Sequence, residues 1–335
     1  LFKNVPESLR IANNWPHVLQ SLLRLWLRYV VRNKAKTERL RKNVTTANVP
    51  FNLLKYFDFV GKHYPFENEF SQFVTLFSML NERKKRWLYL GAPVSSPYSD
   101  DIFYQLQELK LGGVDLLFLF AGDLDGIGHK YGPYSPNYRQ AAKKMGTFLQ
   151  NVFELVQHES ADIRALVFGD HGMANVNNLV NIEKSLKELS VKPGKDYIYF
   201  LDSTLARFWF FNEKAKTEIT ELMQQQKGGR LISDEEKINY HIRYSHNRFG
   251  ELIWWADGGT LILPNFWQGR KEVKGMHGYR YEVRENHAGF LLIDPGLKET
   301  KKLEKPIEMV DIFATMVDML GLDMPQGSHG RSVYA

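Results

Sequence analysis

The chain has 335 residues, which is enough for one large domain or for a domain with an insertion. Hydrophobic residues make up 44% of the sequence and charged residues 24%, a globular composition that argues against intrinsic disorder. There is no cysteine, which excludes disulfide bonds, thiolate-bound zinc and cysteine catalysis. No apolar run reaches the ~18 to 20 residues that a membrane-spanning helix needs.

The net charge of +6 is concentrated near the start of the chain. A helix is expected over residues 16–42, because apolar residues recur at intervals of three and four: Leu19, Leu22, Leu23, Trp26, Leu27 and Val30. The same stretch contains many basic residues: Arg24, Arg28, Arg32, Lys34, Lys36, Arg39, Arg41 and Lys42. Two interpretations remain open, a solvated basic face and attraction to an anionic membrane surface or a polyanionic substrate. Specific nucleic-acid binding is not expected, since no recognised motif accompanies the charge.

Apolar runs and helical periodicity alternate along the rest of the chain. Residues 49–58 are expected to form a loop and a short helix, and helices are expected over residues 70–83, 100–111, 137–157, 181–189, 213–226 and 308–320. Strands are expected over residues 87–90, 114–120, 163–168, 198–201, 206–211, 251–255, 260–263 and 290–293. The alternation up to residue 168 predicts βαβ units, so strands 114–120 and 163–168 should pair in parallel through a right-handed crossover. A turn at Asp257-Gly258-Gly259 predicts a pair of strands around it.

Two segments rich in glycine, aspartate and histidine follow two of these strands. They are Gly-Asp-Leu-Asp-Gly-Ile-Gly-His at residues 122–129 and Phe-Gly-Asp-His-Gly-Met at residues 168–173. Ligands of open α/β sheets gather beyond the carboxyl ends of the strands, which is where both segments should lie. Each segment offers carboxylate and imidazole side chains, a donor set suited to zinc or a similar divalent ion.

The ligand pairs predicted from these segments are Asp125 with His129, on a single tight loop, and Asp170 with His171. A sharp turn at Gly172 would let Asp170 and His171 converge on one ion. His277, in the Gly-Met-His-Gly-Tyr turn at residues 275–279, offers a further imidazole. Each motif alone is also compatible with an ordinary turn, but their combination after two strands favours a two-metal site.

The combination resembles the alkaline phosphatase superfamily, and within it the type I phosphodiesterase and nucleotide pyrophosphatase family. Residues 125–133 are similar to its D-x-x-G-H-x-x-G-P segment, residues 170–173 to its DHGM segment and residues 277–279 to its HGY turn. Further similarities lie at residues 200–209, 263–265 and 320–325. The resemblance covers residues 53 to the end and implies that Asp125, His129 and His277 hold one ion while Asp170 and His171 hold the other.

The resemblance also implies the fold. We expect an α/β chain built as a three-layer α/β/α sandwich with a mostly parallel central sheet, alkaline phosphatase-like, with substrate-facing segments inserted within residues 175–274. Residues 1–84 are expected to form a basic helical connecting or inserted region, and residues 85–335 the metal-binding catalytic core. The tryptophans of the inserted segments favour core packing over stacking on a substrate base: Trp209, Trp254, Trp255 and Trp267.

The chain departs from the family pattern in two places. An early strand ending in a metal-binding aspartate, followed by a threonine or serine nucleophile, is expected upstream of Leu1. Thr45 and Thr46 form the nearest Thr-Thr pair but lack the strand and glycine context of a nucleophile. Arg280 also stands where the family commonly has aspartate. Three further residues are predicted to support the metal ligands, contact the substrate or have a structural role: Asp123, His287 and Arg207.

The predicted function is a metal-dependent hydrolase of phosphate diesters or pyrophosphates. Its cofactors would be two divalent ions, zinc or alternatively manganese, and its substrate a small phosphorylated molecule such as a nucleotide. The nucleophile would attack phosphorus, and water would then release the product. Alternatives are a phosphomonoesterase, sulfatase or phosphotransferase on the same frame, and a non-catalytic metal-binding or interaction protein.

Overall fold

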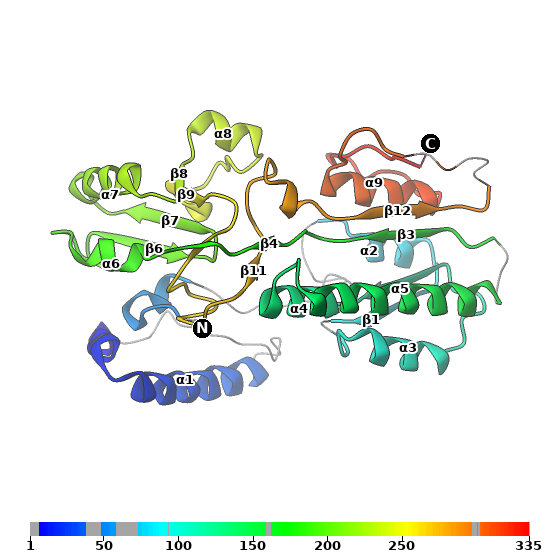
Figure 1. Ribbon diagram of the computed structural model, residues 1–335, viewed down its shortest axis with the longest axis horizontal. Helices are drawn as coiled ribbons and strands as arrows, with labels where there is room; N and C mark the ends of the chain where they lie inside the picture. Colours follow the sequence, from blue (N-terminus) through cyan, green and yellow to red (C-terminus); the bar gives the residue numbers. More distant parts are fainter. Residues whose placement is uncertain are drawn as a thin grey trace. The chain divides into compact units, whose positions relative to one another are not determined.

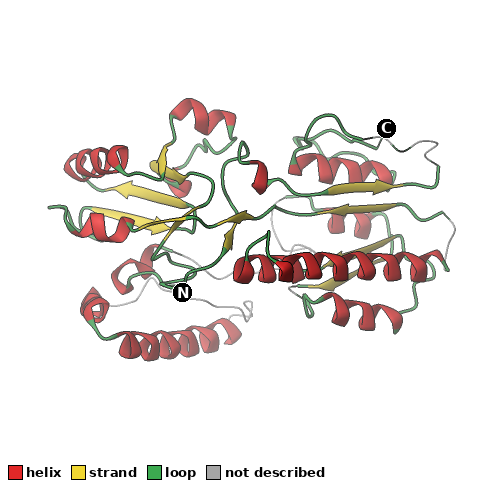
Figure 2. Ribbon diagram, in the orientation of Figure 1, coloured by secondary structure: helices red, strands yellow, loops and turns green. Residues whose placement is uncertain are grey.

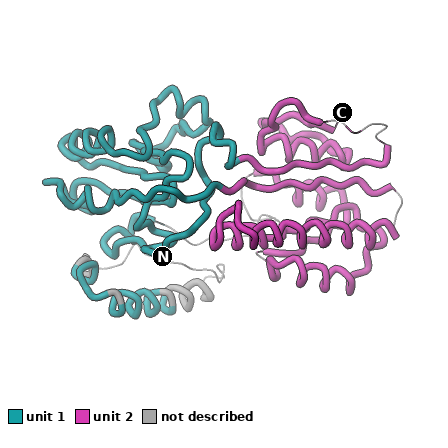
Figure 3. The backbone as a smooth tube through the Cα atoms, viewed as in Figure 1, with its two compact units in different colours: residues 1–62, 174–286 teal, residues 63–173, 287–335 magenta. Residues whose placement is uncertain are grey.

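The computed structural model describes residues 7–37, 48–57, 73–92, 94–158, 162–296, 300 and 302–334. The contacts divide the chain into two compact units (Figure 3). Unit 1 contains residues 1–62 and 174–286, and unit 2 contains residues 63–173 and 287–335. These units do not test the expected division into residues 1–84 and 85–335, which stays a prediction.

Unit 2 contains the strands that precede both predicted motifs (Figure 1). Its elements are α2 (Leu76–Glu82), β1 (Trp87–Gly91), α3 (Ser99–Gln107), β2 (Leu116–Phe120), α4 (Asp123–Tyr131), α5 (Pro136–Gln157), β3 (Ala165–Phe168), β12 (Phe290–Ile293) and α9 (Met309–Met319). Strands β1 and β2 run parallel, with Trp87 opposite Leu116. Helices cover both faces of this pair: Leu88 and Leu117 pack in a cluster with α3 and α5, whereas Trp87 and Leu116 pack with α2 and α9. The β1–β2 pair is therefore the middle layer of an α/β/α arrangement.

The expected parallel pairing of residues 114–120 with residues 163–168 is wrong for the described strands. β2 pairs with β1, whereas β3 pairs antiparallel with β12, with Phe168 opposite Phe290. Hydrophobic periodicity indicates that a segment is a strand, but a continuous apolar run does not specify which strand lies beside it. The side chains of β3 and β12 are half-buried or exposed, and none belongs to a buried cluster of the described core.

Unit 1 is built around a four-stranded antiparallel sheet in the order β6-β7-β9-β8. Figure 2 draws the strands in yellow. Its strands are β4 (Ala174–Asn175), β5 (Asn178–Val180), β6 (Tyr197–Leu201), β7 (Leu205–Phe210), β8 (Gly229–Leu231), β9 (Leu252–Ala256), β10 (Thr260–Ile262) and β11 (Gly275–Met276). Its helices are η1 (Glu7–Asn14), α1 (His17–Thr37), η2 (Phe51–Tyr56), α6 (Ile182–Lys187), α7 (Glu213–Gln225), α8 (Asp234–Asn239), η3 (Asn247–Phe249) and η4 (Arg284–Asn286). Phe208 and Trp254 are fully buried on one face of the sheet, in one cluster with Ile219 of α7.

The turn at Asp257-Gly258-Gly259 does not join two paired strands. β9 lies between β7 and β8, whereas β10 pairs in parallel with β5. Gly259 adopts a positive φ of 80°, and its carbonyl accepts hydrogen bonds from the amides of Asn177 and Asn178. The turn therefore carries the chain out of one sheet and into another pair.

Helix α1 confirms the predicted basic helix as far as Thr37. The rest of that prediction, together with Thr45 and Thr46, lies outside the described residues. None of the described helices is both long enough and apolar enough to cross a membrane.

Candidate metal centre

Asp125 and His129 lie on a helix, not on the tight loop that the sequence predicts. Gly126 and Gly128 disfavour a helix, which is why the loop was expected. α4 nevertheless begins after Gly122 and ends at Gly132, where φ is 84°. Residues four apart share one helix face, and the His129 Nε2 atom lies 3.1 Å from Asp125 Oδ1. The helix therefore presents the carboxylate and the imidazole together.

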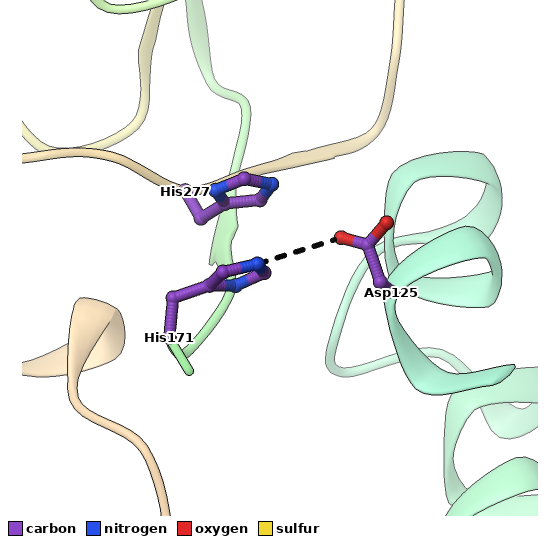
Figure 4. Close-up of side chains that lie close together, drawn as sticks. All are labelled: Asp125, His171 and His277. Carbon is purple, nitrogen blue, oxygen red and sulfur yellow. Dashed lines mark ion pairs between the residues drawn. The ribbon is translucent and has the colours of Figure 1, made fainter. Parts of the chain in front are cut away.

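Asp170 and His171 follow β3 in a short turn. The His171 Nε2 atom lies 3.6 Å from Asp170 Oδ1. It also lies 3.9 Å from Asp125 Oδ1, the ion pair marked in Figure 4. The two motifs of unit 2, which are some forty positions apart in the sequence, thus meet at Asp125 and His171. The ligand atoms of these two residues lie within 4.8 Å of each other. Both histidine side chains are about one-quarter exposed, and the Asp125 and Asp170 side chains are 46% and 60% exposed.

The backbone fixes the orientation of the His171 ring. The His171 Nδ1 atom lies 2.9 Å from the carbonyl oxygen of Gly172. Since a carbonyl only accepts, Nδ1 must carry the hydrogen, and the neutral ring then presents the Nε2 lone pair toward the two carboxylates. Such a hydrogen bond on the far nitrogen is typical of metal-binding histidines.

Gly128 allows the two motifs to pack closely. A Cβ atom at this position would lie 2.8 Å from Met173 Cε, 3.1 Å from Met173 Cγ and 3.3 Å from the Tyr138 ring. A Cβ on Gly126, by contrast, would meet nothing within 4 Å. The glycine needed for the approach of α4 to the Asp170–Met173 turn is therefore Gly128.

His277 lies in unit 1, in a turn that several hydrogen bonds hold. Gly278 has a φ of 82°, and its carbonyl accepts from Thr204 Oγ1 at 2.7 Å and from Trp255 Nε1 at 3.0 Å. The Asn286 side chain accepts from the amides of Gly278 and Tyr279 and donates to the Tyr279 carbonyl. The half-buried His277, also drawn in Figure 4, is thus carried by a rigid turn directly after β11.

Asp123 has a structural contact. Its carboxylate accepts hydrogen bonds from the backbone amide of Ser99 at 2.9 Å and from the Ser99 hydroxyl at 3.0 Å. Ser99 is the first residue of α3, so Asp123 satisfies a free amide at the start of that helix. It ties the start of α4 to the start of α3.

His287 is exposed and stands just before β12, near the second motif. The Gly169 amide donates to the Gly289 carbonyl at 3.0 Å, and a Cβ on Gly169 would lie 3.0 Å from Ala288 Cβ. His287 directly precedes Ala288, which packs against Gly169. Gly169 is in turn the neighbour of Asp170 in the sequence.

Arg207 and Arg280 belong to unit 1, and each has contacts there. The Arg207 guanidinium lies over the rings of Phe200 and Phe249, at 4.9 and 5.1 Å, and 3.9 Å from Asp202. Burial lowers the pKa of Arg207, and the Asp202 charge offsets part of this effect. Arg280 pairs with Asp257 at 2.9 Å.

The sequence did not point to the residues that support these turns. Tyr138, in the first turn of α5, lies against Gly128; burial raises its pKa, and the negative charge of Asp125 adds to the effect. Its position after the Tyr-Gly-Pro segment is the only signal that could have drawn attention to it. For Asn286, Thr204 and Trp255 no pattern in the sequence indicates that all three hold the same turn. Of the tryptophans, Trp254 is fully buried, in agreement with core packing, whereas Trp267 is 47% exposed.

Comparison with known families agrees with this combination of fold and motifs. Residues 7–280 match the model of the type I phosphodiesterase / nucleotide pyrophosphatase family. Because the match covers most of the chain, the chain belongs to this family of the alkaline phosphatase superfamily. The family assignment made from the motifs is thereby confirmed.

Among curated proteins, the chain is similar to ectonucleotide pyrophosphatase/phosphodiesterase family member 7. It is 23% identical to the Mus musculus protein over 225 residues, which is 65% of this chain and 50% of that protein. Identity to the Homo sapiens protein is 22% over 225 residues, covering 65% of this chain and 48% of that protein. The chain spans about half the length of the curated relatives that it matches.

Solved structures with a similar fold include ectonucleotide pyrophosphatase / phosphodiesterase 5. The human structure matches with a TM-score of 0.59 and 19% identity, over 75% of this chain and 71% of that chain. A murine structure of an inactive variant in complex with AMP matches with a TM-score of 0.61 and 20% identity, over 79% and 75% of the two chains. These matches confirm the predicted alkaline phosphatase-like α/β fold.

Proposed function

We propose that the protein is a hydrolase of phosphate diesters or pyrophosphates that depends on two divalent metal ions. The observation that carries the proposal is the approach of His171 Nε2 to Asp125 Oδ1, at 3.9 Å. Asp125 Oδ1 also lies 3.1 Å from His129 Nε2, and His171 Nε2 lies 3.6 Å from Asp170 Oδ1. Two carboxylates and two imidazoles at these distances form a donor set that fits zinc, with manganese as the alternative. The family to which the chain belongs supports the same chemistry.

We assign Asp125, His129 and His277 to one ion and Asp170 and His171 to the other. Support for His277 comes from the motif match and from the rigid turn that carries it, since the Thr204, Trp255 and Asn286 hydrogen bonds would restrict where its ring points. With Nδ1 hydrogen-bonded to the Gly172 carbonyl, Nε2 would be the atom of His171 that binds an ion. The ions, when bound, would polarise the phosphate and lower the pKa of a coordinated hydroxyl or water.

For the substrate we propose a nucleotide-type diester or pyrophosphate. The family description names this class of reaction, and one structural neighbour was solved in complex with AMP. The nucleophile, in our proposal, is a threonine or serine, the residue type that the resemblance to the family implies. The described residues of this chain would supply the metal ligands and orient them.

Metal content tests the ligand assignment without relying on activity. The protein that contains these residues is incubated with zinc, freed of excess metal, and its bound zinc is measured by elemental analysis. We expect two ions per chain, and a loss of zinc in the His171→Ala variant. His158→Ala is the matched control, because His158 is an exposed histidine at the end of α5 in the same unit. Equal zinc content in the two variants would remove His171 from the proposed site.

A further inference from the structure

Helix α1 contacts unit 1 through a narrow stripe. Leu27 is buried and Leu23 is half-buried, and both pack against the core cluster of that unit. The Arg24 guanidinium lies 4.4 Å above the Phe51 ring, and Gln20 donates to the Asn13 and Trp15 carbonyls. Positions 20, 23, 24 and 27 follow the three- and four-residue spacing of one helix face. Among the α1 side chains that the structure describes, those that pack on unit 1 lie on this one face.

Most of the large apolar side chains of α1 are exposed. Their exposed fractions are 71% for Val18, 47% for Leu19, 56% for Leu22, 58% for Leu25, 58% for Trp26, 67% for Tyr29 and 42% for Val30. At 3.6 residues per turn these positions form one continuous band beside the buried stripe. Isolated exposed apolar residues are ordinary, but a contiguous band of this kind indicates a binding surface.

The charge of α1 indicates what the band binds. Its sequence contains no acidic residue and several basic ones: Arg24, Arg28, Arg32, Lys34 and Lys36. Trp26 and Tyr29 lie within the band, and Trp15, just before the helix, is 41% exposed. A helix that combines exposed leucine and aromatic residues with basic residues is suited to the surface of an anionic membrane. A second copy of the helix would be a poor partner, because the two would carry like charge.

We infer that α1 docks the protein on an anionic phospholipid surface. Leu22, Leu25, Trp26 and Tyr29 would enter the boundary between headgroups and acyl chains, while the basic residues of the helix attract the anionic headgroups. The helix would lie on the membrane and not cross it, since no described helix is long and apolar enough to span one. This binding is independent of the metal ligands, all of which are on other elements.

Vesicle flotation tests the inference. The protein that contains these residues is mixed with vesicles of phosphatidylcholine alone or of phosphatidylcholine with phosphatidylserine, at low and high salt. We expect binding to the mixed vesicles to be at least about tenfold stronger than binding to phosphatidylcholine, and to weaken at high salt. Failure of the unchanged protein to bind the mixed vesicles would overturn the inference.

Two double variants locate the binding surface. Leu22→Gln with Trp26→Gln removes apolar side chains from the band without changing charge, and should reduce binding to the mixed vesicles about tenfold or more. Val94→Gln with Tyr104→Gln is the control, because these side chains are 55% and 68% exposed and lie in unit 2. Thermal unfolding confirms that both variants are folded.

Two results would contradict the assignment of the band to lipid. Equal binding by the two double variants would place the lipid contact elsewhere. Self-association in analytical ultracentrifugation that the Leu22→Gln/Trp26→Gln variant abolishes, without vesicle binding by the unchanged protein, would show that the occupant is a second copy.

Discussion

Gly128 illustrates how one residue without a side chain shapes the candidate metal centre. It brings α4 against Met173, at the end of the segment that contains Asp170 and His171. The motifs identify the aspartate and histidine residues that we propose as metal ligands, but the supporting contacts of His171 and His277 could not be predicted from them. The contact of His171 is a backbone carbonyl, which every residue possesses. The turn of His277 is held by Asn286, whose role depends on the path of the chain after Gly278.

The two glycines of α4 should respond differently to alanine. Gly128→Ala introduces a methyl group against Met173 and Tyr138, so we expect a loss of about 1–3 kcal/mol in the free energy of unfolding. Gly126→Ala meets open space within a helix and should be neutral or stabilising by about 0.5–1 kcal/mol. Urea unfolding of both variants measures the difference. Equal effects would show that the close approach at Gly128 has no energetic consequence.

At the scale of elements, the sequence predicts which segments form helices and strands better than it predicts their partners. The long helix α5 lies within one residue of its expected start, where Ser135 accepts from the Tyr138 amide and Pro136 begins the helix. α4 was missed because glycines lower helix propensity, while contacts with α3, α5 and Met173 favour the helix. The expected pairing of β9 with β10 is wrong, because a turn signal does not exclude a change of sheet.

Helix α8 provides a test of local electrostatics. Glu236 forms a capping box with Ser233 and a bidentate ion pair with Arg230. The Arg230 hydrogen bonds lower the pKa of Glu236 to about 2, from a usual value of 4.5. Because the folded state holds the charged form more strongly, the stabilisation is complete above the usual pKa and is lost as the pH falls toward about 2.

Glu236→Gln keeps the size of the side chain but removes this charge. We expect the variant to be less stable than the unchanged protein near neutral pH, by an amount that solvent screening keeps small. The difference should shrink as the pH is lowered through the range between the two pKa values. Urea unfolding at a series of pH values measures it, and a difference that does not change with pH would contradict the proposed role of the Glu236 charge.

At the scale of the whole molecule, the family and the α/β fold were predictable from three short motifs, because their residues must occur in a fixed order and spacing. The sheet was less predictable: the described strands of unit 2 form two separate pairs, and those of unit 1 are mostly antiparallel. The candidate aspartate and histidine ligands can be recognised within short sequence segments. Strand pairing cannot, because it depends on contacts between segments that are far apart in the chain.

The most direct test of the central claim is hydrolysis of bis(p-nitrophenyl) phosphate by the protein that contains these residues, with zinc or manganese present. We predict turnover that falls at least about 100-fold in Asp125→Ala and in His171→Ala, and that is retained in the His158→Ala control. Unchanged turnover in the Asp125 and His171 variants would contradict a phosphodiesterase that depends on this metal centre.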